Sequence, residues 1–269
     1  MQKLEALGII AGNGVYPRLL AAAARKAGVA RIVAAAFTNE TDPALTEHVD
    51  VIEWMRVGQL GRLLKFFRAQ KILHAIMAGQ IAPKNLFDLH PDVKALLLMA
   101  KLKQRNAESI FAAIADELAK AEVELLPATT FLEDSLAQRG LIAGPKLSGR
   151  EEKDVDLGWK IAKEIARLDI GQTMIIKNGT IIALEALEGT NEAIKRGGAL
   201  AREGAVMIKV AKPNQDMRFD VPVIGLETIR IAAEAKLRVI EVEGGKTLLL
   251  EREAIVDLAM RSKITIVAR

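Results

Sequence analysis

The sequence predicts two α/β domains: an N-terminal Rossmann-like domain with a parallel sheet, and a C-terminal α/β domain with a mixed sheet. The chain has 269 residues, about twice the length of a typical domain. In its first half, apolar runs alternate with glycine turns and helical patterns, as in parallel β-α-β units. In its second half, Asn178-Gly179 separates two β-rich runs, which indicates an antiparallel hairpin. Glycines and a loss of periodicity mark 134–150 as a linker between domains at 1–133 and 151–269.

The first domain begins with a strand, a glycine turn and a helix. The apolar run 7–11 ends at Gly12-Asn13-Gly14, and Pro17 stands in the first turn of the next helix, where its missing N–H costs nothing. Gly28 ends that helix, and a second strand follows at 31–37. The other expected elements are strands at 49–54, 72–77 and 123–126, a helix at 60–69 and a helical region at 91–120.

Residues 94–103 combine leucines with lysines. Such a segment suits contact with an anionic membrane surface. It suits equally a buried helix whose lysines extend to solvent. Because core helices are the commoner case, we expect this helix to be buried.

The second domain is expected to open with a helix at 154–168 and the hairpin strands 173–177 and 180–184. Thr190 or Asn191 caps the next helix. Further along, the pattern predicts a strand at 205–211, a loop at 212–222, a helix near 225, a hairpin about Gly244-Gly245, a helix from 252 and a strand at 264–268.

The composition excludes several classes of function. The net charge of +4 and the 4% of aromatic residues are too small for a nucleic-acid-binding surface, so no nucleic acid partner is expected. The absence of cysteine excludes disulfides and a thiol nucleophile. Since no signal peptide or long apolar run is evident, we expect a cytoplasmic protein. The three histidines, His48, His74 and His90, are isolated and are expected to be structural.

Two glycine-containing turns follow strands of the first domain. Ligands of such sheets bind beyond the carboxyl ends of the strands, where N–H groups can hold phosphate oxygens. We therefore expect substrate contacts from Gly12, Gly14, Gly79 and Gln80. The first turn resembles a dinucleotide fingerprint without its third glycine, so a plain tight turn remains an equal alternative.

The loop 212–222 gathers the densest set of charges in the chain. Charged side chains on a loop after a strand point to function more often than to packing. The cations Lys209, Lys212 and Arg218 could neutralise a diphosphate. The carboxylates of Asp216 and Asp220, with Glu185 or Glu188, could hold Mg²⁺, which needs only one or two of them. A solvated surface loop with local salt bridges is the alternative.

Four segments carry a resemblance to a known family. Residues 8–17, 167–172, 183–190 and 212–225 resemble the LpxI-type UDP-2,3-diacylglucosamine pyrophosphatases, in the same order and over essentially the whole chain. The resemblance implies a magnesium-dependent hydrolase of lipid A biosynthesis. Its products would be UMP and 2,3-diacylglucosamine 1-phosphate (lipid X), and its substrate would lie between the two domains.

The resemblance also assigns roles to residues. The essential aspartate of the family lies in a D-x-P-x-I-G segment, which here begins at Asp220. With Asp220 as the catalytic carboxylate, we expect Lys209 and Lys212 to assist catalysis and Asp220, Asp216 and Glu185 to bind the metal. The expected substrate contacts in the second half are Gln172, Thr190, Gln215, Arg218 and Thr228.

Two positions depart from the family pattern. Asn191 stands where aspartate commonly follows Glu-Gly-Thr, and Asn106 replaces one acid of a pair often seen beside Glu108. If either acid is a ligand elsewhere, metal binding here is weaker or arranged differently. The substrate would be a membrane-resident glycolipid nucleotide, so we expect brief contact with the inner membrane, while a homo-oligomer is left open.

Two other functions compete with this hypothesis. A nicotinamide-dependent oxidoreductase would use the first β-α-β unit, with Glu40 on the ribose. A non-catalytic carrier of acylated sugar phosphates would need the binding residues but not Asp220.

Overall fold

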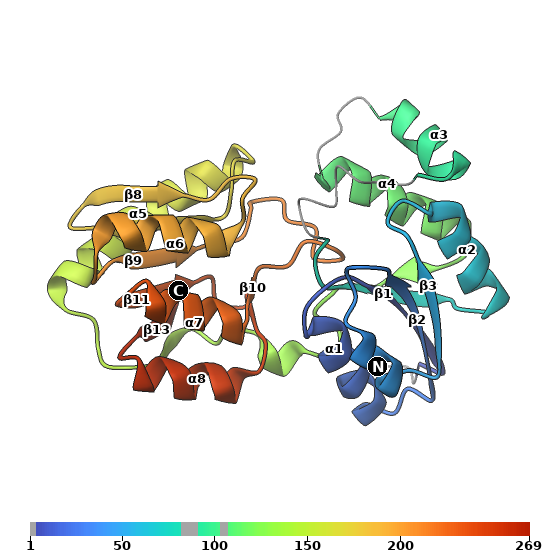
Figure 1. The fold of residues 1–269 in the computed structure, drawn as a ribbon, viewed down its shortest axis with the longest axis horizontal. Helices are drawn as coiled ribbons and strands as arrows, with labels where there is room; N and C mark the ends of the chain where they lie inside the picture. The colour runs from blue at the N-terminus through green and yellow to red at the C-terminus, as the bar shows by residue number, and fades with distance from the viewer. Residues whose placement is uncertain (1–3, 82–90, 103–106) are drawn as a thin grey trace. The chain divides into compact units, whose positions relative to one another are not determined.

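The computed structural model describes residues 4–81, 91–102 and 107–269. The chain folds into two compact units (Figure 1). The N-terminal unit contains 1–133 and also 216–220, whereas the C-terminal unit contains 134–215 and 221–269. The short segment 216–220 therefore packs with the half of the chain to which it does not belong in sequence.

The N-terminal unit is built on five parallel strands in the order β3-β2-β1-β4-β5. This order is typical of Rossmann-like sheets and confirms the predicted class. The strands are β1 (Ala6–Ala11), β2 (Arg31–Phe37), β3 (Val51–Met55), β4 (His74–Ala78) and β5 (Glu124–Leu125).

Helices pack on this sheet through apolar faces. On α1 (Tyr16–Lys26), Leu20, Ala21 and Ala24 are buried at helical spacing. A separate cluster contains β-strand residues with Phe66 and Phe67 of α2 and Leu118 of α4. The remaining helical elements are α2 (Leu60–Ala69), α3 (Val93–Lys101), α4 (Ala107–Lys120) and the 3₁₀ segments η1 (Pro43–His48) and η3 (Glu133–Ser135).

The C-terminal unit contains a six-stranded mixed sheet in the order β6-β13-β11-β9-β7-β8. Its centre is parallel, because β11 pairs in parallel with both β9 and β13, and its edges are antiparallel. The strands are β6 (Gly140–Ala143), β7 (Thr173–Lys177), β8 (Thr180–Leu184), β9 (Val206–Lys209), β11 (Val239–Val242) and β13 (Thr265–Ala268). The hairpin at Asn178-Gly179 is confirmed, with positive φ at both residues.

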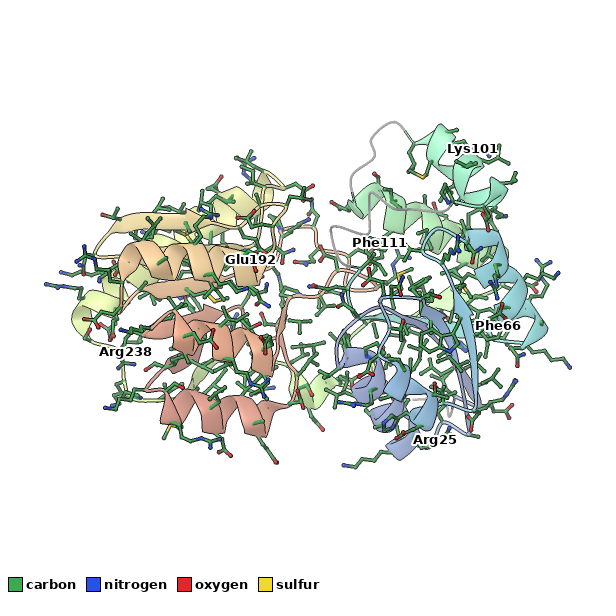
Figure 2. The ribbon with its side chains drawn as sticks, in the orientation of Figure 1. Arg25, Phe66, Lys101, Phe111, Glu192 and Arg238 are labelled. Atoms are coloured by element: carbon green, nitrogen blue, oxygen red, sulfur yellow. The ribbon has the colours of Figure 1, made fainter. Side chains whose placement is uncertain are left out.

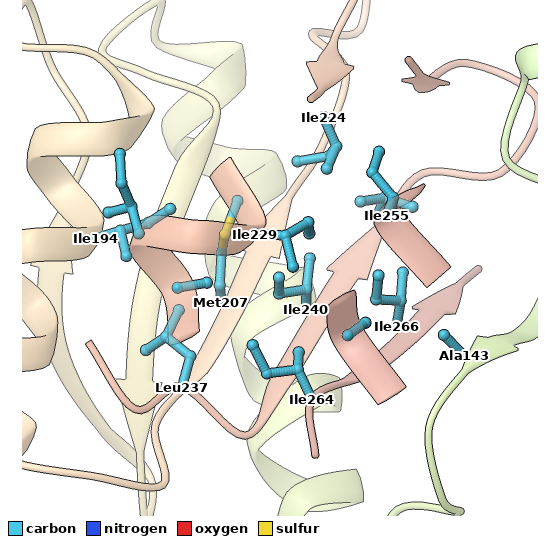
Figure 3. Close-up of a cluster of buried hydrophobic side chains, with 14 of the residues drawn as sticks. Ala143, Ile194, Met207, Ile224, Ile229, Leu237, Ile240, Ile255, Ile264 and Ile266 are labelled. Carbon is cyan, nitrogen blue, oxygen red and sulfur yellow. The ribbon is translucent and has the colours of Figure 1, made fainter. Parts of the chain in front are cut away.

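Helices cover both faces of this sheet. α5 (Gly149–Arg167) contacts β7 and β9 on one face, and α6 (Thr190–Ala201) contacts β7 and β8 on the other, beside α7 (Leu226–Glu234) and α8 (Arg252–Arg261). Figure 3 shows the core beneath α7 and α8, where isoleucines such as Ile229, Ile240 and Ile266 meet. Close packing extends to α6, since a Cβ on Gly198 would lie 2.4 Å from the Cβ of Ala235.

The C-terminal unit starts at Asp134, and the stretch 134–150, expected to be a linker, contains β6, which pairs with β13 at the edge of the sheet. One expectation about the later connections is wrong. No hairpin forms about Gly244-Gly245, because the strand after it, β12 (Leu248–Leu249), pairs in parallel with β10 (Val223–Ile224). The short apolar run after these glycines thus has a distant partner that local sequence does not reveal.

The expected burial of the leucine-rich helix is also wrong. In α3, the exposed fractions are 73% for Val93, 53% for Leu96 and 60% for Leu97. Ala95 is the residue of α3 that is buried, and α3 packs on α2. Lys103, at the end of the segment considered, lies outside the described residues, as do His90 and Asn106.

Glu241 is a fully buried acid in β11. Arg269 Nε lies 3.0 Å from its Oε1, but neither carboxylate oxygen accepts an aligned hydrogen bond within the described residues. Burial raises the pKa of Glu241 to about 7, against the attraction of Arg269 and with a smaller contribution from Asp156. The folded protein therefore holds this proton to higher pH than the unfolded chain does.

The buried acid predicts a specific pH dependence of stability. Between pH 4.5 and about 7, the folded state binds the proton of Glu241 more tightly, so its ionisation lowers stability as pH rises. Glu241→Gln removes this cost, and its stability relative to the parent should increase by about 3 kcal/mol from pH 4.5 to pH 8. Urea unfolding at both pH values measures the change. Glu253→Gln on α8 is the control, and an equal response of both variants would contradict the assignment.

Candidate active site

The two glycine turns of the N-terminal unit meet at the point where the strand order reverses, between β1 and β4. Gly12 N–H donates to the carbonyl of Ala78 at 2.8 Å, and Asn13 N–H donates to the carbonyl of Gln80 at 2.7 Å. Asn13 and Gln80 form an isolated antiparallel bridge. The structure thus brings the four predicted contact residues of this unit to the usual ligand-binding edge of such a sheet.

The contact between the turns explains two of their glycines. A Cβ on Gly12 would lie 2.5 Å from the carbonyl oxygen of Gln80, and one on Gly79 would lie 2.5 Å from that of Asn13. The N–H groups of Gly12 and Asn13 donate to carbonyl groups of the protein itself, so they are not left over for phosphate oxygens. Gly14 differs, because it has positive φ and open space at its Cβ position.

Glu40 lies beside the first glycine turn. It is largely buried and its Oε2 accepts from Asn13 Nδ2 at 3.1 Å. An acid beside this turn is what the dinucleotide alternative requires of Glu40. In this structure, however, the carboxylate of Glu40 accepts a hydrogen bond from the side chain of Asn13 in the turn.

The segment 216–220, which carries Asp220, packs within the N-terminal unit. Met217 accepts through its carbonyl from the N–H of Ala128 at 2.7 Å, and the ring of Phe219 stacks on that of Phe111 at 5.6 Å. Asp220 N–H closes a turn by donating to the carbonyl of Asp216 at 2.9 Å. Backbone and aromatic contacts therefore fix the segment in addition to its charges.

Asp216 and Arg218 are paired with each other. Nη2 of Arg218 lies 2.6 Å from Oδ2 of Asp216, and Nε lies 2.9 Å from Oδ1, so the pair is bidentate. The bond to Arg218 holds the pKa of Asp216 below its usual value. The predicted metal ligand and the predicted phosphate ligand thus neutralise one another here.

The C-terminal unit holds a buried cation at the start of α6. Lys209, the last residue of β9, is 7% exposed and donates from Nζ to Thr190 Oγ1 at 2.6 Å. Thr190 Oγ1 donates to Glu185 Oε1 at 2.9 Å and lies 3.3 Å from Thr173 Oγ1. These four residues, Lys209, Thr190, Glu185 and Thr173, form what we call the anion cluster.

Two side-chain atoms of predicted site residues lack a partner in the part of the chain that the structure describes. They are Oε2 of Glu185 and Nε2 of Gln215, both buried. In addition, α6 begins after Gly189 with no side-chain cap, so its first-turn N–H groups are not satisfied by a cap. A buried lysine at an uncapped helix N-terminus favours an anionic ligand.

The start of α7 joins the same region. Thr228 Oγ1, in the first turn of α7, donates to Oδ1 of Asn191 in α6 at 3.3 Å. The sequence predicted Thr228 and Thr190 as site residues. It did not predict Thr173 as a member of the anion cluster, nor the hydrogen bond between Asn191 and Thr228. Thr173 is a buried polar residue opening an apolar strand, which is the signal that could have identified it.

The other predicted residues of this unit lie along the loop after β9. Lys212 Nζ makes an ion pair with Asp169, and Lys212 N–H donates to Gln215 Oε1 at 2.7 Å. Gln172 contributes its carbonyl, which accepts from Val210 N–H at 2.9 Å. Gln215 is thereby oriented by its oxygen, while its amide nitrogen has no partner within the described residues.

Comparisons with known proteins identify the relationship. The LpxI N-terminal domain model matches residues 6–135, and the LpxI C-terminal domain model matches residues 138–267. The UDP-2,3-diacylglucosamine pyrophosphatase LpxI of Caulobacter vibrioides is 30% identical over 269 residues, covering 95% of this chain and 94% of that protein. The chain belongs to the LpxI family.

The glycine turns and the anion cluster are the candidates for ligand binding that the geometry of this LpxI family member offers. Among the described residues, no group of three or more histidine or acidic side chains is arranged to hold a metal ion. Oε2 of Glu185 is available as a ligand, since it is buried without a partner in the part of the chain that the structure describes. Mg²⁺ commonly takes one or two carboxylates and completes its shell with water and phosphate oxygens, so this donor fits. In the described residues no helix is both long and apolar enough to cross a membrane.

The anion cluster of this LpxI family member can be tested directly with inorganic pyrophosphate. Lys209→Met keeps the length of the buried side chain and removes its charge. We expect pyrophosphate affinity to fall on the order of 10- to 100-fold, because a charge-assisted contact is lost. Isothermal titration calorimetry measures the change. Lys195→Met, in an exposed ion pair with Glu192 on α6, is the matched control, and equal affinities of Lys209→Met and the parent would exclude the cluster.

Proposed function

We propose that this protein hydrolyses the diphosphate of UDP-2,3-diacylglucosamine to UMP and 2,3-diacylglucosamine 1-phosphate. The observation that carries the proposal is the full-length relationship to an enzyme of that name, combined with a buried cation at an uncapped helix start. A diphosphate carries the charge that this arrangement favours. The reaction is a hydrolysis, so water supplies the attacking oxygen.

Binding of the diphosphate is assigned to the C-terminal unit. Lys209 and the N–H groups at the start of α6 would hold phosphate oxygens, with Lys212 adding a second positive charge. Because Lys209 is desolvated before substrate arrives, its attraction for an anion is stronger than that of an exposed lysine. Gln215 Nε2 is buried without a partner in the described residues, which leaves it as a donor for substrate.

The chemical step is assigned to Asp220. Its carboxylate would accept a proton from the attacking water as the new oxygen–phosphorus bond forms and the bridging oxygen leaves with its phosphate. The turn that Asp220 N–H closes on Asp216, and the pairing of Asp216 with Arg218, hold the carboxylate in place. These contacts assign Asp216 and Arg218 to shaping the segment.

Magnesium fits the proposal through Glu185, a member of the anion cluster whose Oε2 has no partner among the described residues. When bound to phosphate oxygens, the ion would withdraw electron density from phosphorus and lower the pKa of coordinated water. Asp216 is the less suitable ligand, because its carboxylate already binds Arg218 at two atoms. Chelation by EDTA should therefore abolish hydrolysis, and magnesium should restore it.

The proposal predicts the effect of removing the carboxylate of Asp220. Asp220→Asn should lower kcat on the order of 100- to 10,000-fold, the usual contribution of a general base. Release of UMP from purified substrate, over a range of magnesium concentrations, measures the loss, and circular dichroism checks the fold. Asp257→Asn on the exposed side of α8 is the matched control. Turnover by Asp220→Asn equal to that of the parent would refute the assignment. Absence of turnover in both Asp220→Asn and the parent would favour the non-catalytic carrier of acylated sugar phosphates.

We further propose that α3 contacts the membrane in which the glycolipid resides. Val93, Leu96 and Leu97 are exposed on this helix, and Lys101 is exposed at its end (Figure 2). Exposed apolar side chains beside a lysine match the interface between acyl chains and anionic headgroups. Lys94 is committed to Glu117 at 2.7 Å, so Lys101 supplies the charge.

Liposome sedimentation tests the role of α3. Replacing Leu96 and Leu97 together by serine should lower the fraction bound to vesicles of phosphatidylethanolamine and phosphatidylglycerol about tenfold, because two apolar side chains no longer insert. Leu200→Ser on α6 removes an equally exposed leucine elsewhere and should bind like the parent. Sedimentation unaffected by the double change would exclude α3 as the contact.

One observation favours the oxidoreductase alternative, namely that Glu40 lies at the first glycine turn. The missing third glycine and the use of Gly12 and Asn13 N–H groups within the protein oppose it. Titration with NADH, followed by fluorescence, separates the two functions, and no binding is expected.

A further inference from the structure

Two charged side chains from different elements hold the peptide groups of Ala211. Lys163, on α5, donates from Nζ to the carbonyl of Ala211 at 2.9 Å and to Oε2 of Glu243 at 2.9 Å. Oε2 of Glu243, just after β11, also accepts from the N–H of Ala211 at 2.9 Å. These contacts close a ring that fixes both polar groups of one residue. We call Lys163 and Glu243 the charged clamp.

The clamp is largely removed from solvent. Glu243 is 9% exposed, and its second oxygen lies 3.0 Å from Nζ of Lys246. Burial raises the pKa of Glu243, but the bonds from Ala211, Lys163 and Lys246 outweigh burial and lower it overall. The carboxylate therefore stays charged inside the fold. Burying such a pair costs desolvation that an apolar contact would avoid, so stability alone is a poor account of its presence.

The position of the clamp along the chain relates it to the anion cluster. Ala211 lies between Lys209 and Lys212, and it is where the chain leaves the sheet. Val210 N–H still makes a sheet-like bond to the carbonyl of Gln172, whereas Ala211 N–H turns to Glu243 instead. The clamp therefore sets the direction in which the loop 212–220 starts.

We propose that Lys163 and Glu243 are positioning residues for the hydrolysis, which orient Lys212 through the peptide groups of the preceding residue, Ala211. The inference rests on the proposed function, since it assigns the clamp to that reaction. Neither residue needs to touch the substrate, because both act through the peptide groups of Ala211. A shift of about 1 Å in a reacting group can lower a rate on the order of 100-fold. Catalysis therefore requires that the loop begin in a fixed direction, which the contacts to Ala211 provide.

Steady-state kinetics of the full chain with UDP-2,3-diacylglucosamine test the clamp. Lys163→Met should lower kcat on the order of 10- to 100-fold with a smaller change in KM. Lys163→Arg, which retains a donor and a charge, should recover part of the loss. Lys195→Met is the matched control, because it breaks an exposed ion pair on α6 and should change neither constant.

A double-mutant cycle separates positioning from general destabilisation. In a Lys212→Ala background, Lys163→Met should cost markedly less than in the parent, because the residue that the clamp positions is already gone. The proposal would be overturned if Lys163→Met lowered kcat by the same factor in both backgrounds. It would also be overturned if the loss of kcat disappeared after correction for the fraction of protein that is folded. If Lys163→Met does not fold, the same cycle with Glu243→Gln decides, since glutamine retains an acceptor for Ala211. A parent chain without turnover would instead refute the proposed function.

Discussion

The arrangement of this protein depends on one short segment, 216–220, that packs in the N-terminal unit although it comes late in the sequence. Residues 216–220 pack with the N-terminal unit through Met217, Phe219 and their partners, although the chain on either side belongs to the C-terminal unit. The catalytic carboxylate that we assign is therefore held by one unit, and the buried cation by the other. Neither unit alone carries both groups.

The two units prepare their residues by different means. In the N-terminal unit, glycines at two turns permit backbones to approach so closely that their own N–H groups are satisfied. In the C-terminal unit, charge is the main device, because Lys209 is buried against hydroxyl and carboxylate groups with one acceptor left open. The open acceptor and the uncapped α6 are preorganised for a ligand, and preorganisation of this kind limits the reorganisation required on binding.

Local rules in the sequence were sufficient for much of the fold. Positive φ at Asn178 and Gly179 follows from turn chemistry, and the alternation of strands and helices is set by apolar periodicity. Contacts between distant residues escaped the same rules. Nothing local reveals that Leu248–Leu249 pairs with Val223–Ile224, or that the leucines of α3 remain exposed because α3 packs through a small residue. Charge density singled out the loop 212–222, and the pairing of Asp216 with Arg218 is the kind of local salt bridge that the alternative interpretation of this loop allowed.

The substitution at Asn191 shows how the family pattern and this geometry fit together. The resemblance predicts aspartate there, and Asn191 Oδ1 accepts from Thr228, a role that a carboxylate oxygen could fill equally well. The hydrogen bond between α6 and α7 thus forms whether residue 191 is neutral or charged. The electrostatic field at the start of α6, in contrast, depends on the charge of that residue. With a neutral amide, one less negative charge opposes an anion beside Lys209. Under the proposed function, this substitution favours direct binding of phosphate by the helix and lysine, with Glu185 as the acid proposed for a cation.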